Sequence, residues 1–270
     1  VPALERIFVF EKFKPETDPR IMSTDQLREL GKRELSKNGD QVYYKRIASV
    51  EPDDVTAIIY TSGTSGPPKG VMETNSGLIR FMKWFSRIVP VSEKDRGISY
   101  LPMAHLLELL NGHWFHIYIG FPQVYAESME RLFDNIQETG PTLNFTTPRF
   151  FEKKYNQIWD EVRHSPKWKK KIVEWCLRVG AKFLDIKENS KRGSIYFFNL
   201  FLHSIAHLLF LRHVRKTVGK HFRFHNTGGA PIPDKIMNFF QACGMPIYES
   251  YGLTEAQGQI GITRPGAYKI

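Results

Sequence analysis

Cysteine is scarce in this chain of 270 residues, which contains only Cys176 and Cys243. Two thiols without a Cys-x-x-Cys spacing argue against a disulfide framework and against a cysteine-rich zinc site. His203 and His207 lie four residues apart, but they lack the glutamate of the His-Glu-x-x-His zinc motif. This composition fits a reducing compartment, so we expect a cytoplasmic protein.

Acidic residues are also in the minority. The chain has 28 Asp and Glu against 38 Lys and Arg, which gives a net charge of +10. Such an excess favours anionic partners, for example nucleotides, coenzyme A or an acidic membrane surface. The sequence has no helix-turn-helix, zinc-finger or RNA-binding signature, so nucleic acid is not predicted as a partner.

A long uninterrupted hydrophobic run is missing as well. The most apolar stretch is Ile195 to Leu211, and it includes Asn199, His203, Ser204 and His207. This stretch is too polar and slightly too short to be a comfortable membrane span. We therefore expect a buried or interfacial helix, and we keep a shallow membrane contact as a hypothesis.

The most informative feature that is present is a run of eleven residues, from Tyr60 to Gly70, directly after the apolar stretch Val55 to Ile59. Glycine lets a backbone turn tightly, and successive backbone N–H groups in such a turn form a concave anion site. The spacing is not that of the Walker A loop, Gly-x-x-x-x-Gly-Lys-Ser/Thr. The run still suits a polyphosphate, because it combines Gly63, Gly66 and Gly70 with the hydroxyls of Thr61, Ser62, Thr64 and Ser65 and the charge of Lys69.

A second constellation lies near the end of the chain. Gly228 and Gly229 offer a flat backbone surface, and Tyr251 offers an aromatic face on which a base can stack. Thr254 supplies a hydroxyl, and Glu255 is an oxygen ligand of the kind that Mg²⁺ uses together with substrate phosphates. Taken alone, the five residues from Tyr251 to Glu255 would be read as an ordinary turn. Their interpretation as part of a ligand site gains weight from the glycine-rich run.

A third segment, Ser99 to His105, reads as a strand that ends at Pro102 and is followed by an apolar-periodic helix. His105 is then at a strand-to-helix junction, where α/β proteins often place site residues. A single histidine there is more often a packing residue than a substrate contact.

Together the three segments resemble the adenylate-forming (acyl-activating) superfamily. Ser65 stands where that family more often has threonine, which keeps the hydroxyl. The resemblance implies that Lys69, Thr254 and Glu255 serve catalysis, that Glu255 holds Mg²⁺, and that His105 and Gly228 lie beside the acyl substrate. It further implies nucleotide contacts from Thr61, Ser62, Gly63, Thr64, Ser65, Gly66, Lys69, Gly229, Ala230, Pro231, Tyr251, Gly252 and Thr254.

The passage Pro148 to Lys153 resembles fatty acyl-CoA synthetases, and the nucleotide motifs look most like the bacterial form of the long-chain enzymes. Long-chain members often continue His-x-x-Glu-Arg, whereas this chain has Glu108 followed by Leu109. The implied reaction joins a fatty acid to ATP and then to coenzyme A. Two alternatives stay open: another adenylate-former, such as an aryl-acid ligase or a luciferase-like enzyme, and a non-catalytic nucleotide- or lipid-binding fragment.

The resemblance implies an α/β fold, the layered αβαβα subdomains of the large N-terminal AMP-binding domain, over residues 1–270. By the same comparison we expect an internal fragment, with the upstream part, the ribose-binding segment, the hinge and the small lysine-bearing C-terminal domain outside it. We also expect Lys69 and Glu255 to face one cavity. The predicted strands are Arg6–Phe10, Val55–Thr61, Gly97–Leu101, Gln123–Ala126, Leu143–Thr146, Phe222–His225 and Pro246–Glu249. The clearest helices are Thr24–Ser36, for which Ser23 and Gln26 form a candidate capping box, Ser76–Ile88, whose inward side chains are Leu78, Phe81, Met82 and Phe85, and Asp234–Ala242.

Overall fold

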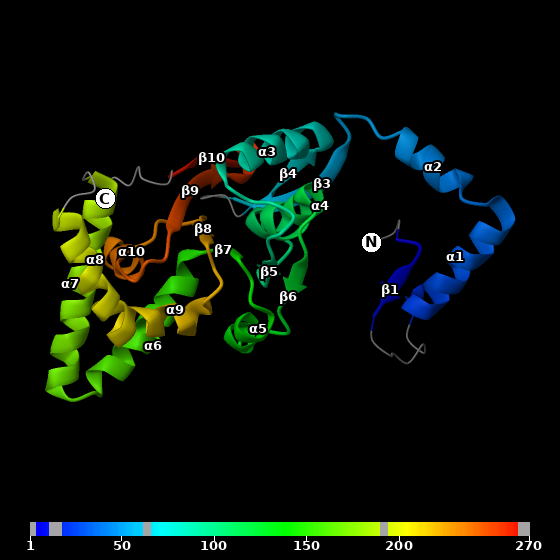
Figure 1. The fold of residues 1–270 in the computed structure, drawn as a ribbon. Helices are drawn as coiled ribbons and strands as arrows, with labels where there is room; N and C mark the ends of the chain where they lie inside the picture. Colours follow the sequence, from blue (N-terminus) through cyan, green and yellow to red (C-terminus); the bar gives the residue numbers. More distant parts are fainter. Residues whose placement is uncertain (1–3, 11–17, 62–65, 190–193, 264–270) are drawn as a thin grey trace. The chain divides into compact units, whose positions relative to one another are not determined.

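The computed structural model describes residues 4–10, 18–61, 66–189 and 194–263. The chain forms two compact units, Val1–Asp54 and Val55–Ile270. In the first unit, two short parallel strands precede two helices (Figure 1). Ser23 accepts a hydrogen bond from the backbone of Gln26, whose side chain accepts one from the backbone of Ser23, so the predicted capping box is confirmed. The elements are β1 (Ile7–Val9), β2 (Ile21–Ser23), α1 (Thr24–Asn38) and α2 (Gln41–Ala48).

The second unit is built around a six-stranded sheet with the order β10-β9-β8-β7-β5-β6. Its strands pair in parallel, except that β10 runs antiparallel to β9. The chain passes from β5 outward to β6 and then returns to the other side of β5 to form β7. Ligands of open α/β sheets bind beyond the carboxyl ends of the strands at such a reversal. The strands are β5 (Gly97–Ser99), β6 (Gln123–Tyr125), β7 (Leu143–Thr146), β8 (Phe224–Thr227), β9 (Ile247–Leu253) and β10 (Gly258–Ile262).

Helices cover both faces of this sheet, and side chains alternate between two hydrophobic cores. Ile247 belongs to the core shared with α6, α7, η2, α9 and α10, whereas its neighbour Tyr248 belongs to the core shared with α3, η1 and α4. This alternation follows from the two-residue period of a strand. The helical elements are α3 (Asn75–Ile88), η1 (Glu108–Trp114), α4 (Phe115–Ile119), α5 (Leu132–Thr139), α6 (Pro148–Arg163), α7 (Lys167–Asn189), α8 (Ser194–Ala206), η2 (His207–Leu211), α9 (Arg212–Gly219), α10 (Asp234–Ala242) and η3 (Thr254–Ala256).

The glycine-rich run joins the two strands of a separate antiparallel hairpin, which leads into α3. The strands are β3 (Val55–Thr61) and β4 (Lys69–Thr74). Thr74 caps α3 by accepting a hydrogen bond from the backbone of Gly77 at 3.3 Å. The inward face of α3 buries the four apolar side chains expected from the sequence, Leu78, Phe81, Met82 and Phe85. The helix therefore fixes the hairpin to the rest of the unit.

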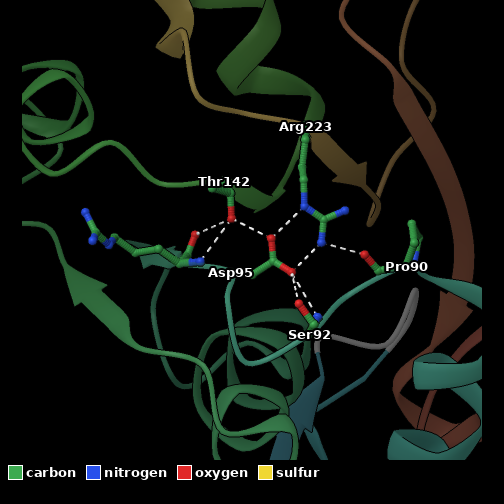
Figure 2. Close-up of polar contacts among 6 residues, drawn as sticks. Pro90, Ser92, Asp95, Thr142 and Arg223 are labelled. Atoms are coloured by element: carbon green, nitrogen blue, oxygen red, sulfur yellow. Dashed lines mark hydrogen bonds and ion pairs between the residues drawn. The ribbon is translucent and has the colours of Figure 1, made fainter.

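At the amino ends of the strands, an ion pair between the buried Asp95 and the half-exposed Arg223 joins three loops (Figure 2). The Arg223 guanidinium donates to the carboxylate of Asp95, with 2.6 Å between Nε and Oδ1, and also to the carbonyl of Pro90. Thr142 donates to the same carboxylate at 2.7 Å, and the backbone N–H of Ser92 donates at 2.9 Å. The network holds the entries to β5, β7 and β8 together, on the side of the sheet opposite the strands' carboxyl ends.

The predicted elements are largely confirmed, with three corrections. The strand predicted at Phe222–His225 is wrong by two residues, because β8 extends through the buried polar Asn226 and Thr227. The strand after Pro246 continues to Leu253, where it pairs with β10, which the sequence did not predict. The apolar stretch near Ile195 belongs to a longer helical segment, Ser194–Gly219, whose length and mean hydropathy (1.6 over 18 residues) match those of a membrane-crossing helix.

A candidate nucleotide and acyl site

A cavity lies at the carboxyl edge of the sheet and brings together three segments that are distant in the sequence. Its lining includes His105 after β5, Gly228 after β8, and Thr254 after β9. Its volume is about 70 Å³. Its remaining lining residues are Leu106, Leu107, Leu110, Asn111, Gly229, Ser250, Gly252, Leu253, Gly258 and Gln259.

His105 stands immediately before the helix that begins at Leu106. Its Nδ1 accepts a hydrogen bond from the backbone N–H of Leu107 at 3.2 Å. A neutral imidazole that accepts at Nδ1 carries its proton on Nε2. His105 is exposed, so this geometry equips it to donate a hydrogen bond to a ligand in the cavity.

The glycines after β8 are required by close approach and by backbone conformation. A Cβ on Gly228 would lie 3.0 Å from the hydroxyl oxygen of Ser250, and Gly229 has a φ of 83°, which favours glycine. The next residues are held by a side chain that the sequence did not single out. Glu249 accepts a hydrogen bond from the backbone N–H of Ile232 at 2.9 Å and so fixes this loop to β9.

A second cavity shares Gly229 and Gly252 with the first and has a volume of about 620 Å³. Ala230, Pro231 and Tyr251 line it together with Gly229 and Gly252. The ring of Tyr251 is 66% exposed, so its face is open to a planar ligand. The residues predicted to contact adenine therefore border one space, which is the geometry a base would need.

Glu255 lines a third cavity, between η3 and the face of α3 that carries Arg80. Its carboxylate is exposed and has no hydrogen-bond or ion-pair partner among the described residues. Two residues later, Gln257 reaches the start of α3. A Cβ on Gly77 would lie 1.7 Å from the Gln257 side-chain oxygen, and Gln257 Nε2 is 3.5 Å from Thr74 Oγ1. These contacts bring the Glu255 segment next to the helix that follows the hairpin.

The glycine-rich run is described only at its two ends. Thr61 ends β3 and pairs with Lys69, which begins β4, and Gly66 has a φ of 109°. The predicted contacts Ser62, Gly63, Thr64 and Ser65 lie outside the described residues. Lys69 lines none of the three cavities described above, so its convergence with Glu255 on one ligand stays a prediction.

A buried carboxyl supports the His105 segment. Glu108 is 1% exposed and accepts a hydrogen bond from the hydroxyl of Ser99 at the end of β5. Burial raises the pKa of Glu108 above its ordinary value, and the Ser99 hydrogen bond opposes that rise. Gly112 leaves room for this side chain, because a Cβ there would lie 2.1 Å from Glu108 Oε1. Glu108 therefore positions the helix rather than facing a ligand.

Two lining residues of the first cavity were missed in the sequence. Asn111 donates through Nδ2 to the Leu107 carbonyl, and Gln259 donates through Nε2 to Asn226, but the oxygen of each amide is buried without a hydrogen-bond partner among the described residues. A buried acceptor of this kind calls for a donor from water or ligand. Asn111 could have been found from the sequence, because it is a polar residue four positions after Leu107 in an otherwise apolar helix. No feature of the sequence points to Gln259.

The chain is similar to long-chain-fatty-acid–CoA ligase 5 of Mus musculus, with 32% identity over 231 residues that make up 83% of this chain and 32% of the relative. It is also similar to the ligase ACSBG2 of Xenopus laevis, with 27% identity over 100% of this chain and 36% of the relative. The chain thus spans about a third of the length of these curated relatives.

Solved structures share the fold. Apo MatB from Rhodopseudomonas palustris matches with a TM-score of 0.53 and 17% identity, over 82% of this chain and 33% of that one. The N-terminal domain of FACL13 from Mycobacterium tuberculosis matches with a TM-score of 0.51 and 19% identity, over 92% of this chain and 49% of that one. The expected α/β fold of the adenylate-forming enzymes is therefore confirmed. The model of the AMP-binding enzyme family matches residues 8–269, and the chain belongs to that family.

Proposed function

We propose that this chain provides the nucleotide- and acyl-binding part of a long-chain fatty acid–CoA ligase. The reaction begins when a fatty acid carboxylate attacks the α-phosphorus of ATP, which forms an acyl-adenylate and releases pyrophosphate. The thiol of coenzyme A then attacks the acyl carbonyl, which forms the thioester and releases AMP. The similarity to long-chain ligases over most of the chain supports the substrate class.

The single observation that carries the proposal is a pair of cavities that share Gly229 in their lining. One is bordered by His105 and Thr254, the other by Tyr251. A substrate acid in the first cavity and adenine in the second would bring carboxylate and α-phosphate together near Gly228 and Thr254. Holding two reactants in line converts a bimolecular step into an effectively unimolecular one. In this arrangement the Nε2–H of His105 would orient the carboxylate, and no residue needs to form a covalent intermediate.

The donor set fits a magnesium ion held mainly by its substrate. Among the described residues no group of three or more His, Cys, Asp or Glu side chains is placed to hold a metal. Mg²⁺ in nucleotide sites commonly uses one or two carboxylates together with phosphate oxygens, and the exposed, unpaired Glu255 meets that requirement. When bound, the ion would offset the negative charge that develops on the phosphates. Lys69, Gly66 and Thr61 would neutralise and bind the β- and γ-phosphates, together with Ser62, Gly63, Thr64 and Ser65.

The test is pyrophosphate exchange with a panel of fatty, aryl and amino acids, followed by measurement of AMP release on addition of coenzyme A. We expect exchange with long-chain fatty acids. Thr254→Ala and Glu255→Gln should reduce it at least tenfold, whereas Glu174→Gln, which removes an exposed carboxylate on α7, should not. Exchange with aryl acids alone would assign the chain to a different adenylate-former. ATP binding without exchange in the complete natural chain would contradict catalysis.

A further inference from the structure

The helical segment that begins with α8 has an unusual outward face. Six large apolar side chains on it are between 56% and 70% exposed, whereas its inward side chains, among them Phe210, Leu211 and Val214, lie in the core. A large exposed apolar patch normally marks an interaction site. We call these side chains the apolar face of α8, after the helix where the face begins; they are Ile195, Phe197, Phe198 and Phe201 on α8 and Leu208 and Leu209 on η2.

The charge within the segment that carries this face has one sign. From residue 189 to residue 233 the sequence has no Asp or Glu, but it has seven Lys and Arg. The outward face itself becomes basic where α8 and η2 pass into α9, at the exposed Arg212, His213 and Lys216. The neighbouring α7, which packs against α8, contributes Lys171, Arg178 and Lys182 beside the acids Glu174 and Asp185 (Figure 1).

We propose that the apolar face of α8 docks on the surface of an anionic lipid bilayer. Large apolar side chains beside clustered Lys and Arg are typical of helices that bind in the headgroup region. The phenyl rings of Phe197, Phe198 and Phe201 would enter the acyl boundary, while Arg212 and Lys216 would meet the headgroup phosphates. The apolar and the electrostatic contributions are both needed, because apolar burial supplies the affinity for the bilayer and charge supplies the preference for anionic lipid.

The helix lies in the plane of the membrane surface and does not cross the bilayer. Its length and hydropathy would allow a span, but only 22% of its most apolar window is buried, and the buried side belongs to the protein core. Phe210, Leu211 and Val218 pack in the same cluster as Phe240 and Ile247. A crossing helix would have to withdraw these side chains from the core, whereas an in-plane helix uses only the face that is already exposed.

The experiment is co-flotation of the complete natural chain with vesicles of phosphatidylcholine, with and without phosphatidylglycerol, at low and high salt. We expect binding to the anionic vesicles, weakened by salt. The triple variant Phe197→Ser, Phe201→Ser, Leu208→Ser should bind about a thousandfold more weakly, because each large apolar side chain removed from water contributes roughly a factor of ten and the three factors multiply. The matched control is Ile117→Ser with Tyr125→Ser, which removes side chains of similar exposure (56% and 59%) from α4 and β6.

A second pair of variants isolates the charge. Arg212→Glu with Lys216→Glu should abolish the preference for phosphatidylglycerol, whereas Lys45→Glu with Arg46→Glu on the exposed α2 should not. Thermal melting checks that each variant is folded. Wild-type protein that fails to float with anionic vesicles at low salt overturns the proposal. So does a triple variant that floats normally but has lost a dimer seen by light scattering, since the face would then bind a second copy of the chain.

Discussion

Replacing the buried carboxyl of Glu73 should change the pH dependence of stability in a way that few single substitutions do. Glu73 lies on β4 next to the glycine-rich run and is 0% exposed. Neither of its carboxyl oxygens has a hydrogen-bond partner among the described residues. Burial without a partner disfavours the ionised form and raises the pKa of Glu73 from 4.5 to about 7.

The direction of the pH effect on stability follows from the protonation of Glu73 in the folded and in the unfolded chain. Between pH 4.5 and 7 the unfolded chain loses the Glu73 proton while the folded chain keeps it, so the contribution to folding is fully present below pH 4.5 and is lost as pH rises. One pKa unit corresponds to about 1.4 kcal/mol, so the 2.5 units between 4.5 and 7 amount to about 3 kcal/mol. Wild-type protein at pH 8 should therefore be less stable by about this amount than it would be with a neutral side chain at this position.

The assay is urea denaturation of wild-type protein and Glu73→Gln at pH 4.5 and at pH 8. The gain in the free energy of unfolding on substitution should be about 3 kcal/mol larger at pH 8 than at pH 4.5. Taking the difference between two pH values removes the cost of burying an unpaired amide, which is the same at both. Glu174→Gln, at an exposed position on α7, controls for the loss of one carboxylate. A gain that is equal at both pH values would refute the reasoning, because it would mean that Glu73 is ionised in the folded state.

Three further substitutions probe the sheet. Burial lowers the pKa of His225 from 6.5 to about 3, so the free energy of unfolding should fall by about 1.4 kcal/mol per unit as pH drops below 6.5, and urea titrations of His225→Gln should show a smaller fall. Arg223→Ala leaves the carboxylate of Asp95 buried without its cation and should cost about 2–4 kcal/mol, with a double-mutant cycle through Asp95→Asn recovering much of it. Gly252→Ala places a Cβ 2.5 Å from a carbonyl oxygen of β10 and should lower both the melting temperature and pyrophosphate exchange, whereas Gly261→Ala has open space and should change neither.

Local signals in the sequence predicted the elements whose causes are local. The capping box at Ser23 and the apolar spacing of α3 gave helices that the structure confirms almost to the residue. The strands β2, β4 and β10 were missed, and β10 was missed because its own residues favour a strand only weakly. Gly258–Ile262 contains two glycines and a glutamine, and it is a strand because β9 pairs with it.

The carboxyl end of β8 was also mispredicted, because its cause is not local in the sequence. Asn226 and Thr227 are polar, so the apolar pattern stops before them, yet both are 0% exposed. Asn226 is tolerated because segments far along the chain bond to both ends of its amide: its Nδ2 donates to the carbonyl of Tyr248, and its Oδ1 accepts from Gln259. A buried polar group is satisfied by the tertiary fold, so its burial cannot be predicted from its own neighbours in sequence.

The sequence predicted the parts of the candidate site where a glycine marks a backbone requirement. It did not predict the side chains from other segments that complete the site. Gly228 is a glycine because the Ser250 hydroxyl lies 3.0 Å from where a Cβ would be, whereas Gly77, which leaves room for Gln257 in the same way, belongs to no motif and was missed. The motif records the glycine but not its partner, so the sequence located the meeting points of the segments without naming what meets there. Glu249, which fixes the loop after Gly229, belongs to no motif for the same reason: its role arises only once β9 lies beside that loop.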